Sequence, residues 1–167
     1  MAHRSSKLEV LLNGRQVGRL SRAANGAIDF RYVREWLDWE HAMPVSLSRP
    51  LDTLRYTGAT ALAVFDNLLP DNDDIRRRIA GRVGAQGDDA YSLLAAVGRD
   101  CVGALQFLPE GEGGTASLSL DAEPIGDDAI AAMLRYLGRA PLGLRADDAF
   151  RISIAGAQEK TALLWFE

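Results

Sequence analysis

Cysteine and histidine are scarce in this sequence of 167 residues, which has one cysteine, Cys101, and two histidines. A lone cysteine cannot form an internal disulfide, so we expect Cys101 to be reduced and buried. Zinc sites take their ligands mainly from these two residue types, so the composition argues against a bound zinc ion. The sequence shows no secretory leader and no apolar run long enough to cross a membrane, which predicts a cytoplasmic protein.

An excess of positive charge is also lacking. The formal net charge is −4 at pH 7, although 25% of the residues are charged. The chain therefore has no overall basic footprint for DNA or RNA, and a role on DNA would need a partner protein. The sequence does contain 47% apolar residues, which is the composition of an ordinary globular protein that can bury a core.

Two common nucleotide-binding motifs are missing as well. There is no G-x-G-x-x-G, and only Lys160-Thr161 fits a Walker A loop, because Ile154 and Glu159 stand where glycines are required. Residues 150–166, F-R-I-S-I-A-G-A-Q-E-K-T-A-L-L-W-F, nevertheless predict a strand, a tight loop and a second strand. Successive N–H groups in such a small-residue loop can bind an anion, although the same pattern also fits an ordinary core hairpin.

The start of the chain predicts an antiparallel sheet. Asn13-Gly14 separates two strand patterns, and Asn-Gly supplies the positive φ angles of a type I′ hairpin turn. Strands are expected over 7–12, 16–20 and 27–32, with an edge strand over the alternating residues 43–48. Between them, residues 34–40 predict a short helical turn whose two tryptophans are interpreted as structural.

Three helices are predicted next, over 60–69, from a cap at Asp71 or Asn72 to 83, and over 90–97, followed by a strand over 104–108. Gly84 and Gly98 are expected to end the second and third of these helices. The second helix carries four arginines: Arg76, Arg77, Arg78 and Arg82. They form either a solvated face or a docking surface for an acidic partner or nucleic acid.

Residues 110–115, E-G-E-G-G-T, predict a linker because they include three glycines and no apolar residue. The linker separates a first unit, residues 7–110, from a second unit, residues 116–167. The second unit is expected to contain an extended piece near 116–120, a helix over 127–137 and the hairpin described above. The fold class is therefore predicted to be α+β, an antiparallel sheet with packed helices followed by a smaller helix-and-sheet element.

Four stretches, in this order, carry a family resemblance. They are M-P-V-S-L-S at 43–48, F-D-N-L-L-P-D at 65–71, G-R-D-C-V-G-A at 98–104 and S-I-A-G-A-Q-E-K-T at 153–161. Together they resemble the HipA-type serine/threonine kinase toxins, the kinase half of a bacterial toxin–antitoxin pair. The resemblance implies that the first unit is that family's N-terminal subdomain and that the second begins a kinase-like N lobe.

The resemblance also assigns roles around the hairpin. Its loop would hold the phosphates of ATP, with Mg²⁺ as the accompanying ion in a complete kinase. The loop residues are Ala155, Gly156, Ala157, Gln158, Glu159 and Lys160. Ser153 matches the serine that these kinases phosphorylate on themselves, and a phosphate there would expel the loop and silence the enzyme. Without the resemblance, Ser153 would be interpreted as a strand serine bonded to nearby backbone, and Lys160 as a solvated lysine or as a partner of Glu159.

In the family, the catalytic and metal-binding aspartates and the adenine pocket follow this hairpin, whereas the present chain stops at Glu167. Phosphoryl transfer needs those groups, so we expect the chain to be inactive alone and to contain no catalytic or metal-binding residue. It would be a fragment, a truncated product, or one subunit of a split system whose other chain carries the catalytic lobe. Asp66, Asn67 and Asp71 are interpreted as helix caps.

The implied partners are a small helix-turn-helix antitoxin, through which DNA would be reached indirectly, and a protein substrate such as a glutamyl-tRNA synthetase. Two other hypotheses stay open. The chain could be a non-catalytic protein that docks on a kinase toxin or an antitoxin and regulates it, or a plain α+β binding domain. Ser153 and the intact loop favour the kinase hypothesis, because a docking module has no evident need for them.

Overall fold

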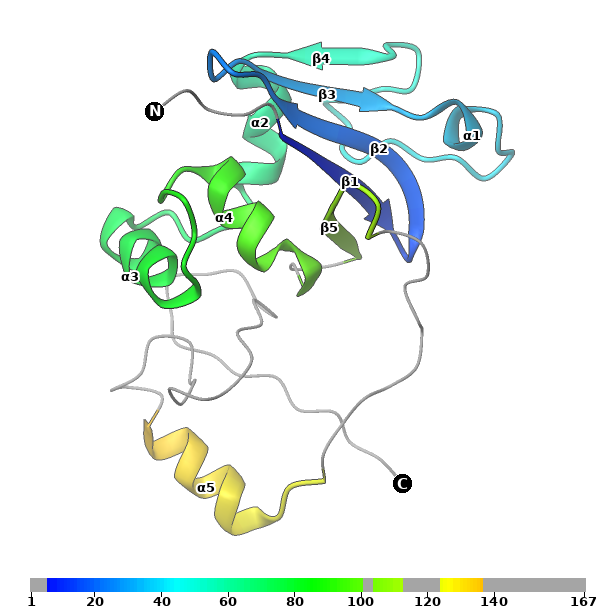
Figure 1. The fold of residues 1–167 in the computed structure, drawn as a ribbon. Helices are drawn as coiled ribbons and strands as arrows, with labels where there is room; N and C mark the ends of the chain where they lie inside the picture. The colour runs from blue at the N-terminus through cyan, green and yellow to red at the C-terminus, as the bar shows by residue number, and fades with distance from the viewer. Residues whose placement is uncertain (1–5, 101–103, 113–123, 137–167) are drawn as a thin grey trace.

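The structure, a computed structural model, describes residues 6–100, 104–112 and 124–136. Its strands form one five-stranded sheet in the order β4-β3-β2-β1-β5, in which every neighbouring pair is antiparallel. The strands are β1 (Ser6–Leu12), β2 (Arg15–Arg22), β3 (Ile28–Tyr32), β4 (Arg55–Thr57) and β5 (Leu105–Pro109). The predicted α+β class with an antiparallel sheet is confirmed (Figure 1).

The β1–β2 hairpin has the predicted turn, since Asn13 and Gly14 have φ angles of 50° and 77°. Gly18 in β2 faces the core, where a larger residue would not fit. A Cβ atom there would lie 2.6 Å from the backbone oxygen of Arg31 and 2.6 Å from the ring of Phe30. The missing side chain lets β3 and its aromatic residues pack directly on β2.

The helices are α1 (Arg34–Leu37), α2 (Ala59–Asp66), α3 (Asp73–Val83), α4 (Ala90–Val97) and α5 (Asp127–Tyr136), with a 3₁₀ turn over Gly98–Asp100. Asn72 is the N-cap of α3, and its Oδ1 accepts from the N–H groups of Asp74 and Ile75 at 2.9 and 3.2 Å. Gly84 ends α3 in the left-handed conformation, with φ 66°. Both boundary predictions for this helix are therefore confirmed.

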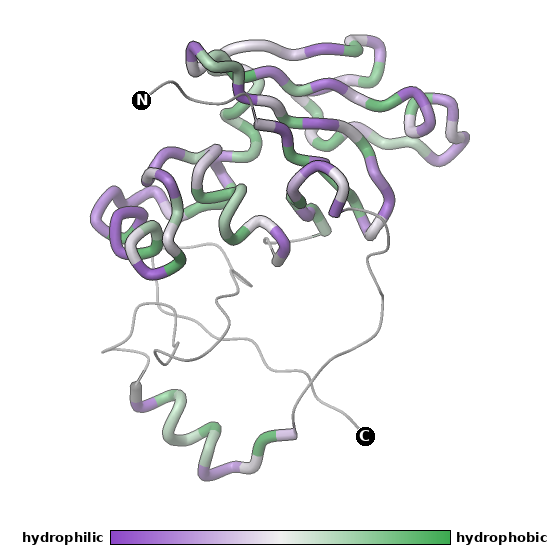
Figure 2. Tube along the Cα trace, viewed as in Figure 1, coloured by the Kyte–Doolittle hydropathy of each residue, from purple (hydrophilic) through white to green (hydrophobic). Residues whose placement is uncertain are grey.

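The core lies between one face of the sheet and helices α2 and α4 (Figure 1). Three fully buried rings from different elements form its centre. Phe65 of α2 packs edge-to-face on Phe30 of β3 and on Phe107 of β5, with centroids 5.1 and 5.2 Å apart. Aromatic pairs in this arrangement add to the stabilisation from burial alone. Figure 2 shows the corresponding contrast between the apolar α4 and the largely hydrophilic α3.

The predicted edge strand over 43–48 is wrong, because these residues form turns. The Ser46 Oγ accepts from the Ser48 N–H at 3.3 Å, and the Ser46 carbonyl accepts from the Arg49 N–H at 2.8 Å. Such local hydrogen bonds compete with strand pairing. The strand that pairs with β3 instead is β4, which the sequence analysis did not predict.

Candidate functional site

The predicted nucleotide loop, residues 155–160, and the proposed phosphorylation site Ser153 lie outside the described residues, as does Cys101. Within the described ranges, no group of three or more Asp, Glu, His or Cys side chains could hold a metal ion. In the same part of the chain, no helix combines the length and apolar character needed to cross a membrane. A candidate site must therefore come from surfaces of the N-terminal sheet and its helices.

The F-D-N-L-L-P-D stretch acts as a structural joint between α2 and α3. Arg76 donates through Nη1 to Asp66 Oδ1 at 2.8 Å and through Nε to the Pro70 carbonyl at 2.6 Å. The Arg76 side chain is only 14% exposed. The capping role predicted for Asp66 is therefore wrong, because its carboxylate holds Arg76. Because Arg76 is held by these contacts, it does not contribute to the exposed basic face predicted for α3. On that helix Arg77 forms an ion pair with Asp74 at 2.8 Å.

The M-P-V-S-L-S loop is fixed to the sheet by two aromatic side chains. The Tyr32 hydroxyl donates to the Arg49 carbonyl at 2.7 Å and accepts from the Val45 N–H at 3.1 Å. Trp36 donates through Nε1 to the Met43 carbonyl at 3.0 Å, which confirms a structural role for this tryptophan. Although the loop is tied down, its Met43 and Leu47 side chains are 55% and 96% exposed.

A second polar joint connects β2 to α4. Arg22, whose side chain is 12% exposed, donates to Ser92 Oγ at 3.0 Å and pairs with Asp89 at 3.4 Å. Its guanidinium also lies over the Tyr91 ring at 4.5 Å. Asp89 in turn caps α4 by accepting from the Ser92 N–H at 3.0 Å. Arg22 Nε and the Tyr91 hydroxyl are buried without a hydrogen-bond partner among the described residues, but the other contacts tie β2 to α4, and we interpret the joint as structural.

The remaining feature is a row of three arginines on the sheet face opposite the core. Arg19, Arg31 and Arg55 lie directly opposite one another on β2, β3 and β4, and all three are exposed. We call Arg19, Arg31 and Arg55 the arginine row. Arg55 donates through Nε to Asp29 Oδ2. Among the described residues, neither Arg19 nor Arg31 has a carboxylate within ion-pair distance.

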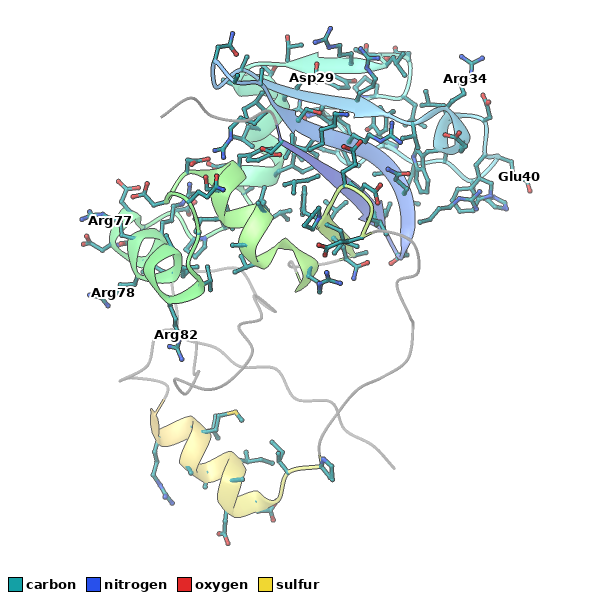
Figure 3. All side chains as sticks on the ribbon, viewed as in Figure 1. Asp29, Arg34, Glu40, Arg77, Arg78 and Arg82 are labelled. Atoms are coloured by element: carbon teal, nitrogen blue, oxygen red, sulfur yellow. The ribbon has the colours of Figure 1, made fainter. Side chains whose placement is uncertain are left out.

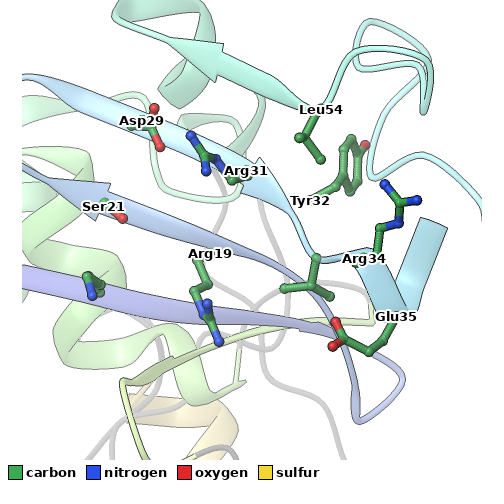
Figure 4. A pocket seen from close by; sticks show the side chains of 10 residues that line it. Arg19, Ser21, Asp29, Arg31, Tyr32, Arg34, Glu35 and Leu54 are labelled. Carbon is green, nitrogen blue, oxygen red and sulfur yellow. The ribbon is translucent and has the colours of Figure 1, made fainter. Parts of the chain in front are cut away.

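Arg19 and Arg31 line a shallow hollow of about 490 Å³ on this face. Its wall includes the Ser21 hydroxyl, the Glu35 carboxylate and the half-exposed side chain of Leu54 (Figure 4). The guanidinium groups of Arg19 and Arg31 and the Ser21 hydroxyl can donate hydrogen bonds to an anionic ligand. Leu54 offers an apolar contact beside them. The sequence contains a signal for this hollow, because Arg19 and Arg31 are each directly next to a residue that is buried in the strand, Leu20 or Phe30, and alternation then places the arginines on the outer face.

The family model for the HipA N-terminal domain matches residues 8–108, which hold nearly all of the sheet and α1 to α4. The chain belongs to the HipA family. The resemblance drawn from the four sequence stretches is therefore confirmed.

Two relatives of this HipA-family chain align over almost its whole length. The protein named "Putative kinase Y4mE" from Sinorhizobium fredii is 32% identical over 160 residues, covering 94% of this chain and 38% of the relative. The "Serine/threonine-protein kinase toxin HipA" from Shewanella oneidensis is 26% identical over 159 residues, covering 95% of this chain and 35% of the relative. The chain thus spans little more than a third of the length of either protein.

Proposed function

We propose that the chain is the N-terminal portion of a HipA-like serine/threonine kinase toxin. The observation that carries this proposal is the extent of the two alignments. They cover 94% and 95% of the chain, so both continue well beyond residue 108, where the match to the N-terminal domain ends. This extent favours a kinase portion over a free-standing copy of the N-terminal domain.

In this function the loop of Ala155, Gly156, Ala157, Gln158, Glu159 and Lys160 receives the ATP phosphates. Small residues allow the backbone N–H groups to approach the phosphates, and Lys160 supplies a positive charge at the edge of the loop. Ser153 is the proposed autophosphorylation site, because a phosphate there would compete for the same positive groups. Mg²⁺ binding and phosphoryl transfer require an aspartate-bearing lobe in addition to this loop.

The proposed partner of the N-terminal domain is a helix-turn-helix antitoxin. Exposed apolar side chains on a fixed backbone are typical of protein contact surfaces. Met43 and Leu47 meet this description, since they are 55% and 96% exposed on a loop that Tyr32 and Trp36 hold in place. The same observation supports the second candidate, a non-catalytic subunit that docks on a kinase toxin or an antitoxin and regulates it.

A calorimetric titration with Mg·ATP tests the nucleotide proposal. The chain offers a matched control because its two lysines are Lys160 and Lys7. Lys160→Ala is expected to weaken ATP binding while changing the free energy of unfolding by less than about 0.5 kcal/mol, because the proposal gives Lys160 a role in binding and not in packing. Lys7→Ala is expected to leave ATP binding unchanged, because Lys7 lies on β1 and pairs with Glu110 at 3.2 Å.

The outcomes separate the candidates. A loss of ATP binding in Lys7→Ala but not in Lys160→Ala would place the nucleotide on the sheet face and contradict the loop assignment. If the chain instead inhibits an active HipA-family kinase in trans and binds no ATP, the regulatory function is supported. If ATP-linked chemistry returns only when a second chain with the catalytic lobe is added, the chain is one subunit of a split kinase.

A further inference from the structure

The arginine row contains a repulsive pair that the fold does not need. Arg19 and Arg31 are directly opposite each other on neighbouring antiparallel strands, which brings their side chains to about 5 Å at the Cβ atoms. Like charges in this relation destabilise a sheet. Both side chains are exposed, so neither packs in the core that the other face of the sheet forms. The pair thus costs stability without contributing to packing.

The carboxylates closest in register do not fully relieve this repulsion, because none of them pairs with Arg19 or Arg31. Asp29, two residues before Arg31, accepts from Arg55. Glu9 is opposite Arg19 on β1 and offsets part of the repulsion, but its Oε1 accepts from the Gly111 N–H at 3.4 Å and it makes no ion pair with Arg19. Arg19 and Arg31 are therefore opposite each other in register, and neither makes an ion pair with a carboxylate of the described residues.

The surface around these two groups is open over β2 to β4. Helices α2 and α4 pack on the other face of the sheet (Figure 1). On the β1–β5 side of this face, Leu11 and Leu108 are only 1% and 3% exposed, whereas Arg19, Arg31 and Arg55 are all exposed. Leu54, 47% exposed, adds an apolar contact at one side of the hollow.

We propose that this surface binds an acidic polypeptide segment. Its Asp or Glu carboxylates pair with Arg19 and Arg31, and a neighbouring apolar side chain of the segment packs on Leu54. Arginine suits this role because its planar fork binds a carboxylate with two parallel hydrogen bonds. Binding would remove the repulsion between the two guanidinium groups at the same time. This interaction does not depend on nucleotide binding or on the kinase assignment.

The surroundings favour a polypeptide over nucleic acid. The hollow mixes the carboxylates of Asp29 and Glu35 with its cations, so it offers places for single carboxylates but no continuous basic track for a phosphate backbone. The chain as a whole has a net charge of −4, whereas nucleic-acid surfaces extend over many basic residues. A surface that combines cations, carboxylates and the exposed apolar Leu54 instead matches the polar rim and apolar contact of a protein interface.

The test uses the complete 167-residue chain and a synthetic peptide of alternating Glu and Ser with a central Leu. Binding is followed by fluorescence anisotropy and by NMR of the arginine Nε–H groups. The double variant R19E/R31E is compared with R77E/R78E, which reverses the same charge at two exposed arginines of α3. Arg77 and Arg78 project from the side of the molecule away from Arg34, which lies next to the hollow (Figure 3).

We expect the peptide to shift the Nε–H signals of Arg19 and Arg31, and to bind at least about tenfold more weakly to R19E/R31E, since two ion pairs become repulsions. R77E/R78E is expected to bind like the unaltered chain. Equal weakening in both variants, or no binding at about 1 mM peptide, would overturn the proposal. So would duplex DNA that binds through Arg19 and Arg31 when the peptide does not.

Discussion

Replacing Arg31 by glutamate should make the domain more stable. Arg31 is the middle residue of the arginine row, with Arg19 opposite it on β2 and Arg55 opposite it on β4. The substitution turns both cross-strand relations from like-charged to oppositely charged. Each such pair is worth about 0.2–1 kcal/mol, and all three side chains are exposed, so we expect a gain of roughly 0.5–1.5 kcal/mol at low salt.

Urea unfolding at two salt concentrations measures this effect. In 1 M NaCl the Debye length falls to about 3 Å, so most of the gain should disappear. Arg31→Gln, which removes the repulsion without adding attraction, should lie between the two charged forms. Arg78→Glu, an exposed charge reversal on α3, should change stability by less than about 0.5 kcal/mol. A loss of stability in Arg31→Glu at low salt, or a gain that 1 M NaCl does not reduce, would refute the electrostatic reasoning.

Three further predictions test the core and its joints. Gly98→Ala should cost about 1–3 kcal/mol of unfolding free energy, because its Cβ would lie 2.6 Å from the Cβ of Phe107; an unchanged melting curve would contradict this packing. Asp66→Ala should cost about 1 kcal/mol in urea unfolding by leaving Arg76 without its carboxylate, and Asp71→Ala, an exposed aspartate nearby, serves as the control. Burial raises the pKa of the Tyr32 hydroxyl, so the native state holds that proton more tightly than the unfolded state. The contribution of Tyr32 to the free energy of unfolding should therefore be fully present below pH about 10 and should fall above it. In Tyr32→Phe, the free energy of unfolding measured against pH should decrease less at alkaline pH.

Local signals in the sequence predicted much of the fold. Asn13-Gly14 determines its own turn, because both residues adopt the positive φ angles that the hairpin needs. Asn72 and Gly84 mark the ends of α3 for equally local reasons, a side-chain cap and a left-handed stop. Such features depend on a few neighbouring residues, so they can be inferred without knowing the rest of the structure.

The errors occurred where long-range contacts decide the outcome. Residues 43–48 alternate like a strand, yet the position beside β3 is taken by β4, which has only three residues and no recognisable pattern. Asp66 looked like a helix cap because it lies near the end of α2, but its partner Arg76 is on the next helix. Neither partner can be inferred from periodicity, which reports a residue's own element and not what packs against it.

The arginine row was missed for a related reason, although the information was present. Arg19 and Arg31 each fall within a predicted strand, and the buried Leu20 and Phe30 beside them already place them on the outer face. Only the register of β2 against β3 makes them direct neighbours, since a shift of one residue would move either arginine to the core face. Gly18 fits the observed register, in which it lies against the ring of Phe30 and a Cβ atom would clash. Gly18, which lets β3 pack on β2, is thus part of the register that places Arg19 and Arg31 opposite each other on the outer face.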